Sequence, residues 1–403
     1  MPVQQPKPSV ILLVAATATG PLALNIFVPS MPGLPAVFGT GHATVQLTLS
    51  LYLIGVALGQ LLYGPLSDRY GRRPVLLAGL GLYVAASLAC ALAPSIGLLI
   101  LGRVAQAVGG CAGMVIARAI VRDAWDREEA MRVLALVIAG MAVAPMVAPA
   151  IGGFLDEWFG WRASFLLLAA FGGLVWLAGI RRLPETHRDH TPLPGPAALW
   201  AAYRALFGRR LFLGYALVVG WMTAGFFVFL AAAAYIMSAT LHRPPSEYGL
   251  LFVLLSLGYM AGNATVSRLV GRIRLEALAL AGLALSIAGP VILAGFLAAG
   301  QFSSLTLFLP TVLLCFGNGL TIPVTMSIAV GVDLRLAGTA SGLLGFVQMG
   351  LGAAASSAVG VFEPGDPAVM TAGMLLTNLL ALASWAYARG DREAEAEEAV
   401  RQA

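Results

Sequence analysis

The sequence predicts an all-α integral membrane protein with twelve transmembrane helices in two bundles of six. Hydrophobic residues make up 59% of the 403 residues and charged residues only 11%, whereas a soluble domain carries about a quarter charged residues. Apolar runs of about 20 residues, the length that spans a bilayer core, recur between short polar breaks. The longest polar stretch before the tail, 183–210, divides these runs into two groups of six.

The first bundle is expected over 1–182. Its apolar runs predict spans over 10–36, 44–64, 74–94, 97–121, 131–155 and 161–182. The second bundle is expected over 211–388. Its predicted spans are 211–239, 247–269, 275–299, 304–330, 336–361 and 367–388.

Two polar segments flank the second bundle. The first, 183–210, is expected to be a cytoplasmic linker. It repeats aromatic and basic residues at helical spacing, which predicts a short amphipathic helix on the membrane surface; these residues are Trp200, Tyr203, Arg204 and Phe207. The second, 389–403, is an acidic, alanine-rich cytoplasmic tail that is expected to be a solvated helix or disordered.

Both termini are predicted to be cytoplasmic. With the amino terminus inside, nearly all of the 24 Lys and Arg residues fall on cytoplasmic segments, as the positive-inside rule requires. The arginines are scattered and form no nucleic-acid-binding face. Cys90, Cys111 and Cys315 lie in apolar runs and match no metal or disulfide spacing. We expect a monomeric, multi-pass protein of the bacterial inner membrane that contacts lipid and binds neither nucleic acid nor a metal.

A charged, glycine-punctuated turn, Gly64-Pro65-Leu66-Ser67-Asp68-Arg69-Tyr70-Gly71-Arg72-Arg73-Pro74, separates the second and third spans. Gly64 is expected to let two backbones approach closely, and Gly71 to supply the positive φ of a tight turn. Asp68 stands at a helix end, so its expected partner is an arginine or another helix N-terminus. The stretch resembles the loop between helices 2 and 3 of the major facilitator superfamily (MFS). The resemblance implies the MFS fold of two six-helix bundles.

Charged side chains inside membrane spans are costly and mark functional sites. Arg103 stands well inside the fourth span, which favours a central cavity with a polar partner over a headgroup contact. It resembles the helix 4 motif of MFS drug transporters, whose arginine takes part in proton coupling. Asp123, at the cytoplasmic end of this span, is placed either to pair with Arg72 or Arg69 as a gating latch or to form an ordinary surface ion pair. The predicted gating residues are Asp68, Arg69, Arg72, Arg118, Arg122 and Asp123.

The fifth span carries two prolines, Pro145 and Pro149, and then the pair Gly152 and Gly153. The prolines free backbone carbonyls and bend a helix, and the small residues permit close packing. A generic helix interface explains this composition by itself. The order of proline and glycines resembles the antiporter motif of MFS exporters, with Ala148 at a position that is usually glycine. The resemblance implies export.

The end of the first span, Leu24-Asn25-Ile26-Phe27-Val28-Pro29-Ser30-Met31-Pro32, resembles the Bcr/CflA drug-resistance subfamily, which includes bicyclomycin and chloramphenicol/florfenicol exporters. In that subfamily the position of Asn25 is an aspartate that carries the proton and faces the helix 4 arginine. None of the 19 acidic residues falls mid-membrane in the expected spans, and an amide cannot titrate. Three interpretations stay open: Asn25 is an engineered isostere of a protonated aspartate, proton coupling is lost or has moved to His42 or His242, or the protein is a facilitator.

The substrate cavity is expected between the two bundles near the bilayer midplane, where apolar walls with few polar groups suit an amphipathic drug. For each candidate aromatic or methionine alone, helix packing is the simpler explanation. The candidates are Phe27, Tyr52, Met141, Met146, Phe226, Phe229, Tyr235, Asn318 and Gln348.

Together these features predict multidrug efflux by proton-coupled antiport with alternating access. Asn25 and Arg103 are the expected coupling site, amphenicol-like drugs the expected substrates, and the proton gradient the energy source, without a cofactor. A facilitator or importer of a small metabolite is the alternative, and a non-transporting membrane sensor is the second. The sequence contains neither a nucleophile paired with a base nor a phosphate-binding loop, the features that would indicate an enzyme.

Overall fold

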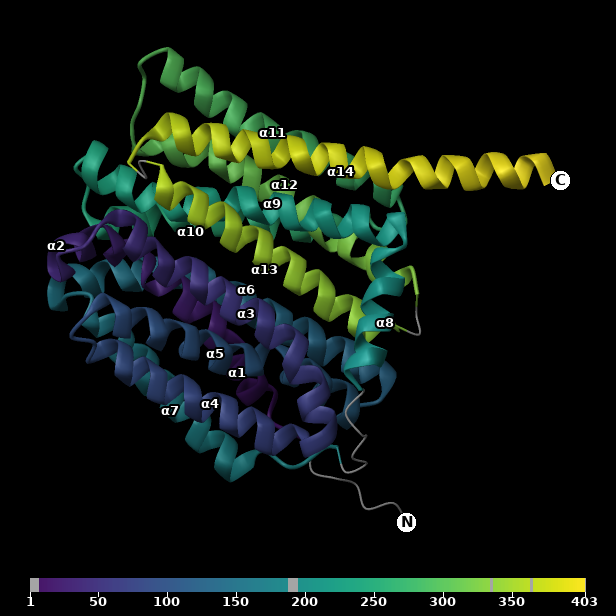
Figure 1. Cartoon of the computed structure of the whole chain (residues 1–403), viewed down its shortest axis with the longest axis horizontal. Coiled ribbons are helices and arrows are strands. Elements are labelled where there is room, and N and C mark those ends of the chain that lie inside the picture. Colours follow the sequence, from purple (N-terminus) through teal and green to yellow (C-terminus); the bar gives the residue numbers. More distant parts are fainter. Residues whose placement is uncertain (1–6, 188–194, 334–335, 363–364, 403) are drawn as a thin grey trace. The chain divides into compact units, whose positions relative to one another are not determined.

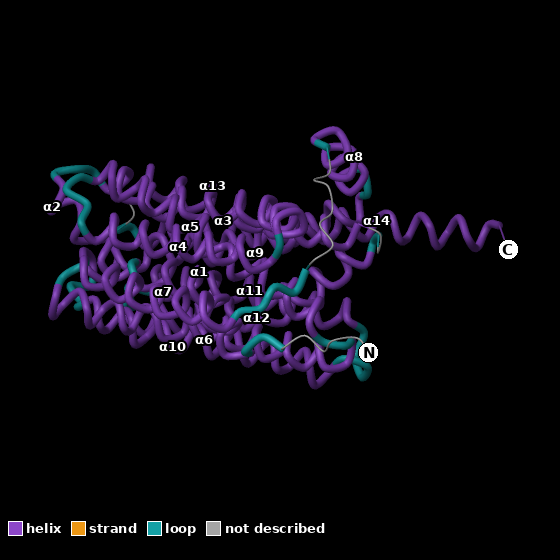
Figure 2. Tube along the Cα trace, turned by 90° about the horizontal axis from the view of Figure 1, so that it is seen from below, coloured by secondary structure: helices purple, strands orange, loops and turns teal. Residues whose placement is uncertain are grey.

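The computed structural model describes residues 7–187, 195–333, 336–362 and 365–402. Within these ranges the chain forms helices joined by loops and turns, with no strand (Figure 1, Figure 2). Twelve helical segments of the described chain are long and apolar enough to cross a membrane, which confirms the predicted number. The elements are α1 (Val10–Ile26), the 3₁₀-helix η1 (Val28–Gly33), α2 (Leu34–Phe38), α3 (His42–Tyr70), α4 (Arg72–Ala91), α5 (Ile96–Ala124), α6 (Arg127–Phe159), α7 (Arg162–Arg182), α8 (Pro196–Phe207), α9 (Arg210–Tyr235), the π-helix η2 (Ile236–Thr240), α10 (Pro245–Leu269), α11 (Leu275–Ala298), α12 (Ser304–Gly331), α13 (Ala337–Val361) and α14 (Pro367–Gln402).

The chain divides into two compact units. The first comprises Met1–Pro194 and Met237–Val253, and the second Gly195–Ile236 and Leu254–Ala403. The boundary therefore crosses α10. In the first unit α1, α3 and α4 pack against the central helix α5, while α6 packs against α1 and α7 against α4. In the second unit α12, α13 and α14 pack against α9, and α11 packs against α12.

Polar caps set the starts of several helices. Ser95 Oγ accepts the Leu98 N–H at the start of α5, and Asp126 Oδ1 accepts the Glu129 N–H at the start of α6. Ser303 and Thr306 form a reciprocal capping box at the start of α12. These side chains satisfy N–H groups that have no partner within their own helix.

The segment between the second and third spans differs from the predicted turn. Helix α3 does not end at Gly64 but continues through Pro65 to Tyr70, so only Gly71 separates it from α4. The expected close approach at Gly64 is wrong, because a Cβ there would meet no atom within 4 Å. The positive φ expected at Gly71 is confirmed at 92°. Membrane helices tolerate an interior proline because neighbouring groups satisfy the freed carbonyl.

Backbones approach closely within each unit. A Cβ on Gly113 of α5 would lie 1.9 Å from the Ala16 carbonyl oxygen of α1. In the second unit, a Cβ on Gly317 of α12 would lie 2.2 Å from the Gly282 oxygen of α11. Lipid-embedded helices associate through such small-residue contacts, since water supplies no hydrophobic driving force there.

The predicted linker helix is present as α8. Part of the expected linker, 188–194, lies outside the described residues. Trp200 on α8 is exposed, whereas Tyr203 packs against the core of the second unit. The tail beyond Arg389 continues α14 as a helix to Gln402 (Figure 1).

Candidate functional site

Arg103 is a fully buried arginine in the middle of the first unit. Helix α5 places it against α1, where its Nη1 donates to the Ala23 carbonyl oxygen at 2.9 Å. The same nitrogen donates to Gln106 Oε1 at 2.7 Å. Gln106 Nε2 in turn donates to Ser87 Oγ of α4 at 2.8 Å. The guanidinium thus begins a polar chain that links α1, α5 and α4.

Three aromatic rings surround the Arg103 guanidinium. Its Cζ lies 4.1 Å from the Tyr52 ring centroid, 5.0 Å from that of Phe27 and 5.9 Å from that of Phe165. The Tyr52 hydroxyl donates to the Gly20 carbonyl oxygen at 2.9 Å, which fixes that ring. A cation held over aromatic faces in a desolvated site gains about 2 kcal/mol per favourable contact. The rings therefore offset part of the cost of burying this charge.

The charge of Arg103 has no carboxylate partner among the described residues. Its Nε and Nη2 atoms also have no hydrogen-bond partner within the described part of the chain. A buried ionised group without a counter-charge is costly. This arginine is therefore poised to respond to any negative charge or hydrogen-bond acceptor that reaches it.

Asn25 is buried on α1 but does not bond to Arg103 in the described structure. Its Nδ2 donates to the Pro21 carbonyl oxygen at 2.8 Å. Arg103 instead binds the backbone oxygen of Ala23. Residues two positions apart in an α-helix are separated by roughly 200° around the helix axis. Ala23 and Asn25 therefore lie on different sides of α1. The predicted coupling pair is connected through the α1 backbone.

A second arginine, Arg72, anchors the junction between α3 and α4. Its Nε lies 2.8 Å from Asp123 Oδ2 at the end of α5. Its Nη1 lies 2.5 Å from Asp68 Oδ1 and 2.6 Å from Ser67 Oγ. The structure thus brings together three of the predicted gating residues inside the first unit.

Glu185, which sequence reasoning missed, completes this cluster. Its carboxylate accepts hydrogen bonds from the backbone N–H of Arg72 at 2.9 Å and the backbone N–H of Arg73 at 3.1 Å. It therefore caps the N-terminus of α4. A carboxylate at a helix N-terminus is favoured by the helix dipole. A Cβ on Gly71 would lie 2.6 Å from Glu185 Oε2, so glycine leaves room for the cap. The available signal was an acidic residue just after the sixth span.

The other predicted gating residues stay outside the cluster. The Arg69 guanidinium lies over the Tyr70 ring at 5.4 Å. Arg118 is half-buried and Arg122 is exposed on α5. Within the described chain none of these three arginines forms an ion pair, so their gating role stays a prediction.

The proline-glycine stretch lies near the end of α6, where it contacts α1. Both Pro145 and Pro149 are inside a helix that continues to Phe159. A Cβ on Gly152 would lie 1.9 Å from the Ile26 carbonyl oxygen, next to Asn25. A larger residue at this position would push α6 away from the segment that carries the predicted coupling site.

Residues 13–357 match the family model described as Major Facilitator Superfamily. The chain belongs to this superfamily. It is similar to multidrug resistance protein D of Escherichia coli (strain K12), with 32% identity over 93% of this chain and 94% of that protein. It is also similar to a chloramphenicol resistance protein of Pseudomonas aeruginosa, with 33% identity over 71% of this chain and 68% of that protein.

The MFS fold is also found by comparison with solved structures. A bacterial homologue of the human lysosomal transporter Spinster superimposes with a TM-score of 0.73 at 17% identity, covering 94% of this chain and 95% of that one. This likeness concerns the fold alone. As an MFS protein with twelve spans, the chain is a multi-pass membrane transporter of small molecules and not an enzyme.

The predicted substrate residues of this MFS transporter fall into two sets. In the first unit, Phe27 and Tyr52 are fully buried around Arg103, and Met141 and Met146 are half-buried on α6. The structure therefore assigns the two aromatics to the surroundings of the buried arginine.

The second set lies in the other unit, largely around α9. Asn318 Nδ2 donates to the Met222 carbonyl oxygen at 3.4 Å, and Gln348 Nε2 donates to Thr223 Oγ1 at 3.0 Å. Phe226, Phe229 and Tyr235 belong to α9 itself, and the Phe229 ring packs edge-on against Phe308 at 5.4 Å. These amides hold α12 and α13 to α9, so interhelical hydrogen bonding accounts for them in this structure.

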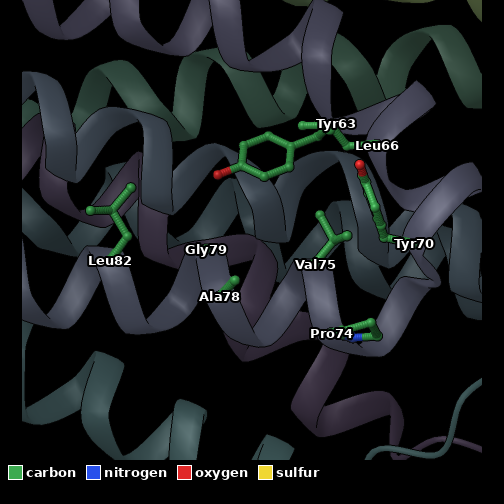
Figure 3. Close-up of a pocket in the computed structure, with 8 residues that line it drawn as sticks. All are labelled: Tyr63, Leu66, Tyr70, Pro74, Val75, Ala78, Gly79 and Leu82. Atoms are coloured by element: carbon green, nitrogen blue, oxygen red, sulfur yellow. The ribbon is translucent and has the colours of Figure 1, made fainter. Parts of the chain in front are cut away.

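An open groove of the MFS transporter lies along α3 and α4 (Figure 3). The Tyr63 hydroxyl lies against α4, 3.3 Å from where a Gly79 Cβ would be. The lining contains no charged side chain and is formed by Tyr63, Leu66, Tyr70, Pro74, Val75, Ala78, Gly79 and Leu82. The groove lacks the groups that proton coupling requires. In the described residues no group of three or more His, Cys, Asp or Glu side chains could hold a metal ion.

Proposed function

We propose that this MFS transporter is a Bcr/CflA-type exporter of small amphipathic drugs, with amphenicol-like compounds as substrates. Export would proceed by proton-coupled antiport with alternating access. The similarity to a multidrug resistance protein and a chloramphenicol resistance protein supports the substrate class. The proline-glycine motif of α6 supports export.

The observation that carries the proposal is the buried guanidinium of Arg103, which has no carboxylate partner among the described residues. It binds the backbone of α1 two residues before Asn25, and α6 packs on the same segment at Gly152. A change in charge near this segment would therefore act on α1, α5 and α6 together. Proton binding and release need such a link if they are to drive a conformational change.

Asn25 occupies the position where the Bcr/CflA resemblance implies a proton-carrying aspartate. An amide keeps the shape of a protonated carboxylic acid but cannot exchange its proton. We propose that Asn25 stands in place of the coupling aspartate and holds the transporter in the protonated-like form. The runner-up is a facilitator, which the amide favours, and His42 and His242 are the alternative proton sites.

The proposal also places the protein in its membrane. Both termini and the Arg72 cluster would face the cytoplasm of a bacterial inner membrane, in accordance with the distribution of Lys and Arg. The transporter would act as a monomer that uses the proton gradient without a cofactor.

Transport of chloramphenicol into proteoliposomes under an imposed pH gradient tests the proposal. The chain is compared with Asn25→Asp, and with Asn378→Asp as a matched control at a buried amide of α14. We expect only Asn25→Asp to move drug against its gradient with proton counterflow. Equal coupling in all forms would indicate that a histidine, and not residue 25, is the proton site. Equilibration of chloramphenicol that does not depend on the pH gradient would indicate a facilitator. Absence of chloramphenicol movement in every form would reject the substrate class.

A further inference from the structure

The backbones of the last turns of α6 and the first turn of α10 approach each other very closely. A Cβ on Gly153 of α6 would lie 2.4 Å from the Pro245 carbonyl oxygen. Reciprocally, a Cβ on Gly249 of α10 would lie 2.3 Å from the Pro149 carbonyl oxygen. Both contacts lie within the first unit, which includes Met237–Val253. The two glycines make this the place where any side chain would force the helices apart.

Glu157, one turn beyond Gly153, adds a directional bond to this contact. Its Oε1 accepts the backbone N–H of Ser246 at 2.8 Å. Ser246 is the second residue of α10, whose first N–H groups have no partner within the helix. A carboxylate there gains from both the hydrogen bond and the helix dipole. Glu157 therefore caps α10 from α6.

The same end of α6 also contacts α1 beside the predicted coupling site. Gly152 packs against the Ile26 carbonyl oxygen, immediately after Asn25. On α6, Gly152 thus contacts α1 and Gly153 contacts the first turn of α10. Glu157 accepts the backbone N–H of Ser246 in that same turn. The same end of α6 therefore contacts both α1 beside Asn25 and the start of α10.

This contact lies at the far end of α6 from the Arg72 cluster. Asp123 of that cluster precedes the start of α6 by four residues. The 33 residues of α6 extend about 50 Å at 1.5 Å per residue. The transporter therefore has one polar cluster near the beginning of α6 and another contact near its end.

We propose that Glu157 is a positioning residue of the transport cycle, which holds the start of α10 on the end of α6. Breaking the Glu157–Ser246 bond frees the first turn of α10 and favours opening of the contact between this turn and α6. The proposal rests on alternating access, as part of the proposed function, but not on the identity of the drug or on proton coupling.

A cysteine reporter at Ala150 measures this opening. The Ala150 Cα would lie 2.6 Å from a Cβ on Gly249, so α10 packs directly against this residue and leaves it half-buried. The purified protein is placed in lipid nanodiscs and labelled with a small maleimide, without drug and without a pH gradient. The native cysteines are buried, and protein lacking the reporter gives the background.

Removing the acceptor is expected to raise the labelling rate. For Glu157→Ala we expect an increase of about tenfold, the population change for loss of one charged hydrogen bond. Ser246→Pro removes the donor but is tolerated in the first turn of a helix, and we expect a similar increase. Glu157→Gln retains an acceptor oxygen, so we expect an increase of about threefold or less.

Glu128→Ala is the matched control, because it removes an exposed carboxylate from the other end of α6. Its labelling rate should equal that of the protein that carries Ala150→Cys alone. Equal rates for Glu157→Ala and Glu128→Ala would overturn the proposal. If Glu157→Ala does not purify as a monodisperse species, Glu157→Asp replaces it, since its shorter side chain withdraws the carboxylate and should also raise the rate. Labelling requires no transport, so this result is independent of the chloramphenicol experiment.

Discussion

Two buried arginines in the same unit have opposite surroundings. Arg72 is 5% exposed and pairs with two carboxylates, Asp68 and Asp123, while Glu185 caps the helix that Arg72 begins. Arg103 is 0% exposed and meets only a backbone oxygen, an amide oxygen and aromatic rings. The first charge is neutralised by its neighbours, whereas the second is not.

This difference indicates different roles. An ion-paired cluster at a helix junction stabilises one arrangement of α3, α4, α5 and the segment after α7. An unneutralised guanidinium in a dry site changes its energy strongly when a proton, an anion or a dipole moves nearby, because the local dielectric is low. We therefore expect Arg72 to matter chiefly for stability and Arg103 chiefly for transport.

The largest effect is expected for Arg103→Met. Measured in the Asn25→Asp background, where we expect active export, drug export should fall at least about a hundredfold, because the proton-binding carboxylate would lose the buried charge that responds to its protonation, and groups that act in proton transfer contribute about that factor or more. The free energy of unfolding should change by less than about 1 kcal/mol, because removal of an unpaired buried charge offsets the lost hydrogen bonds. Vesicle transport and thermal melting measure the two quantities, with the exposed Arg132→Met as a control. A large loss of stability would show that the Arg103 charge is already satisfied.

Arg72→Met should show the reverse pattern. It leaves Asp68 and Asp123 without their counter-ion, and we expect a loss of about 2–3 kcal/mol, since both carboxylates keep some access to water. Melting of the purified protein measures this loss. Arg69→Met is the control, because Arg69 is exposed and forms no ion pair in the described chain. Equal melting of the two variants would contradict a stabilising role for the cluster.

Gly71→Ala tests the junction itself. With φ at 92° and ψ at 153°, Gly71 occupies a region that only glycine adopts readily, so alanine should cost about 1–3 kcal/mol. The added methyl group also meets Glu185. Gly64→Ala is the matched control within the same motif, and it should be neutral or slightly stabilising because the site is helical and open. A harmless Gly71→Ala would mean that the junction can relax.

The smallest effect is expected for Glu185→Gln. The amide oxygen can still accept a hydrogen bond, but the charge at the α4 N-terminus is lost, so about 0.5–1 kcal/mol of stability should disappear. Glu128→Gln, an exposed change on α6, should have no measurable effect. If Glu185→Gln also leaves the melting temperature unchanged, the negative charge of Glu185 does not contribute to stability.

Local properties of the chain were predictable from sequence. Hydropathy and length are properties of contiguous residues, so all twelve spans were expected, with ends within a few residues at most boundaries. The second span was the main error: Gly64 and Pro65 suggested a turn, yet α3 continues to Tyr70. The pairing of Asp68 with Arg72 was also foreseeable, because the two residues are one helical turn apart.

The sequence by itself determined the membrane location, the number of spans, the position of the glycine junction and the isolation of Arg103 from mid-membrane acids. Only the tertiary structure decided that Arg103 binds the Ala23 carbonyl, that Glu185 caps α4 from 113 residues away, and that Glu157 caps α10. The physical reason is that spans follow from the transfer of consecutive side chains into lipid, which each segment undergoes alone. Partners across helices depend on which helix faces meet, and small residues far apart in the chain set those faces.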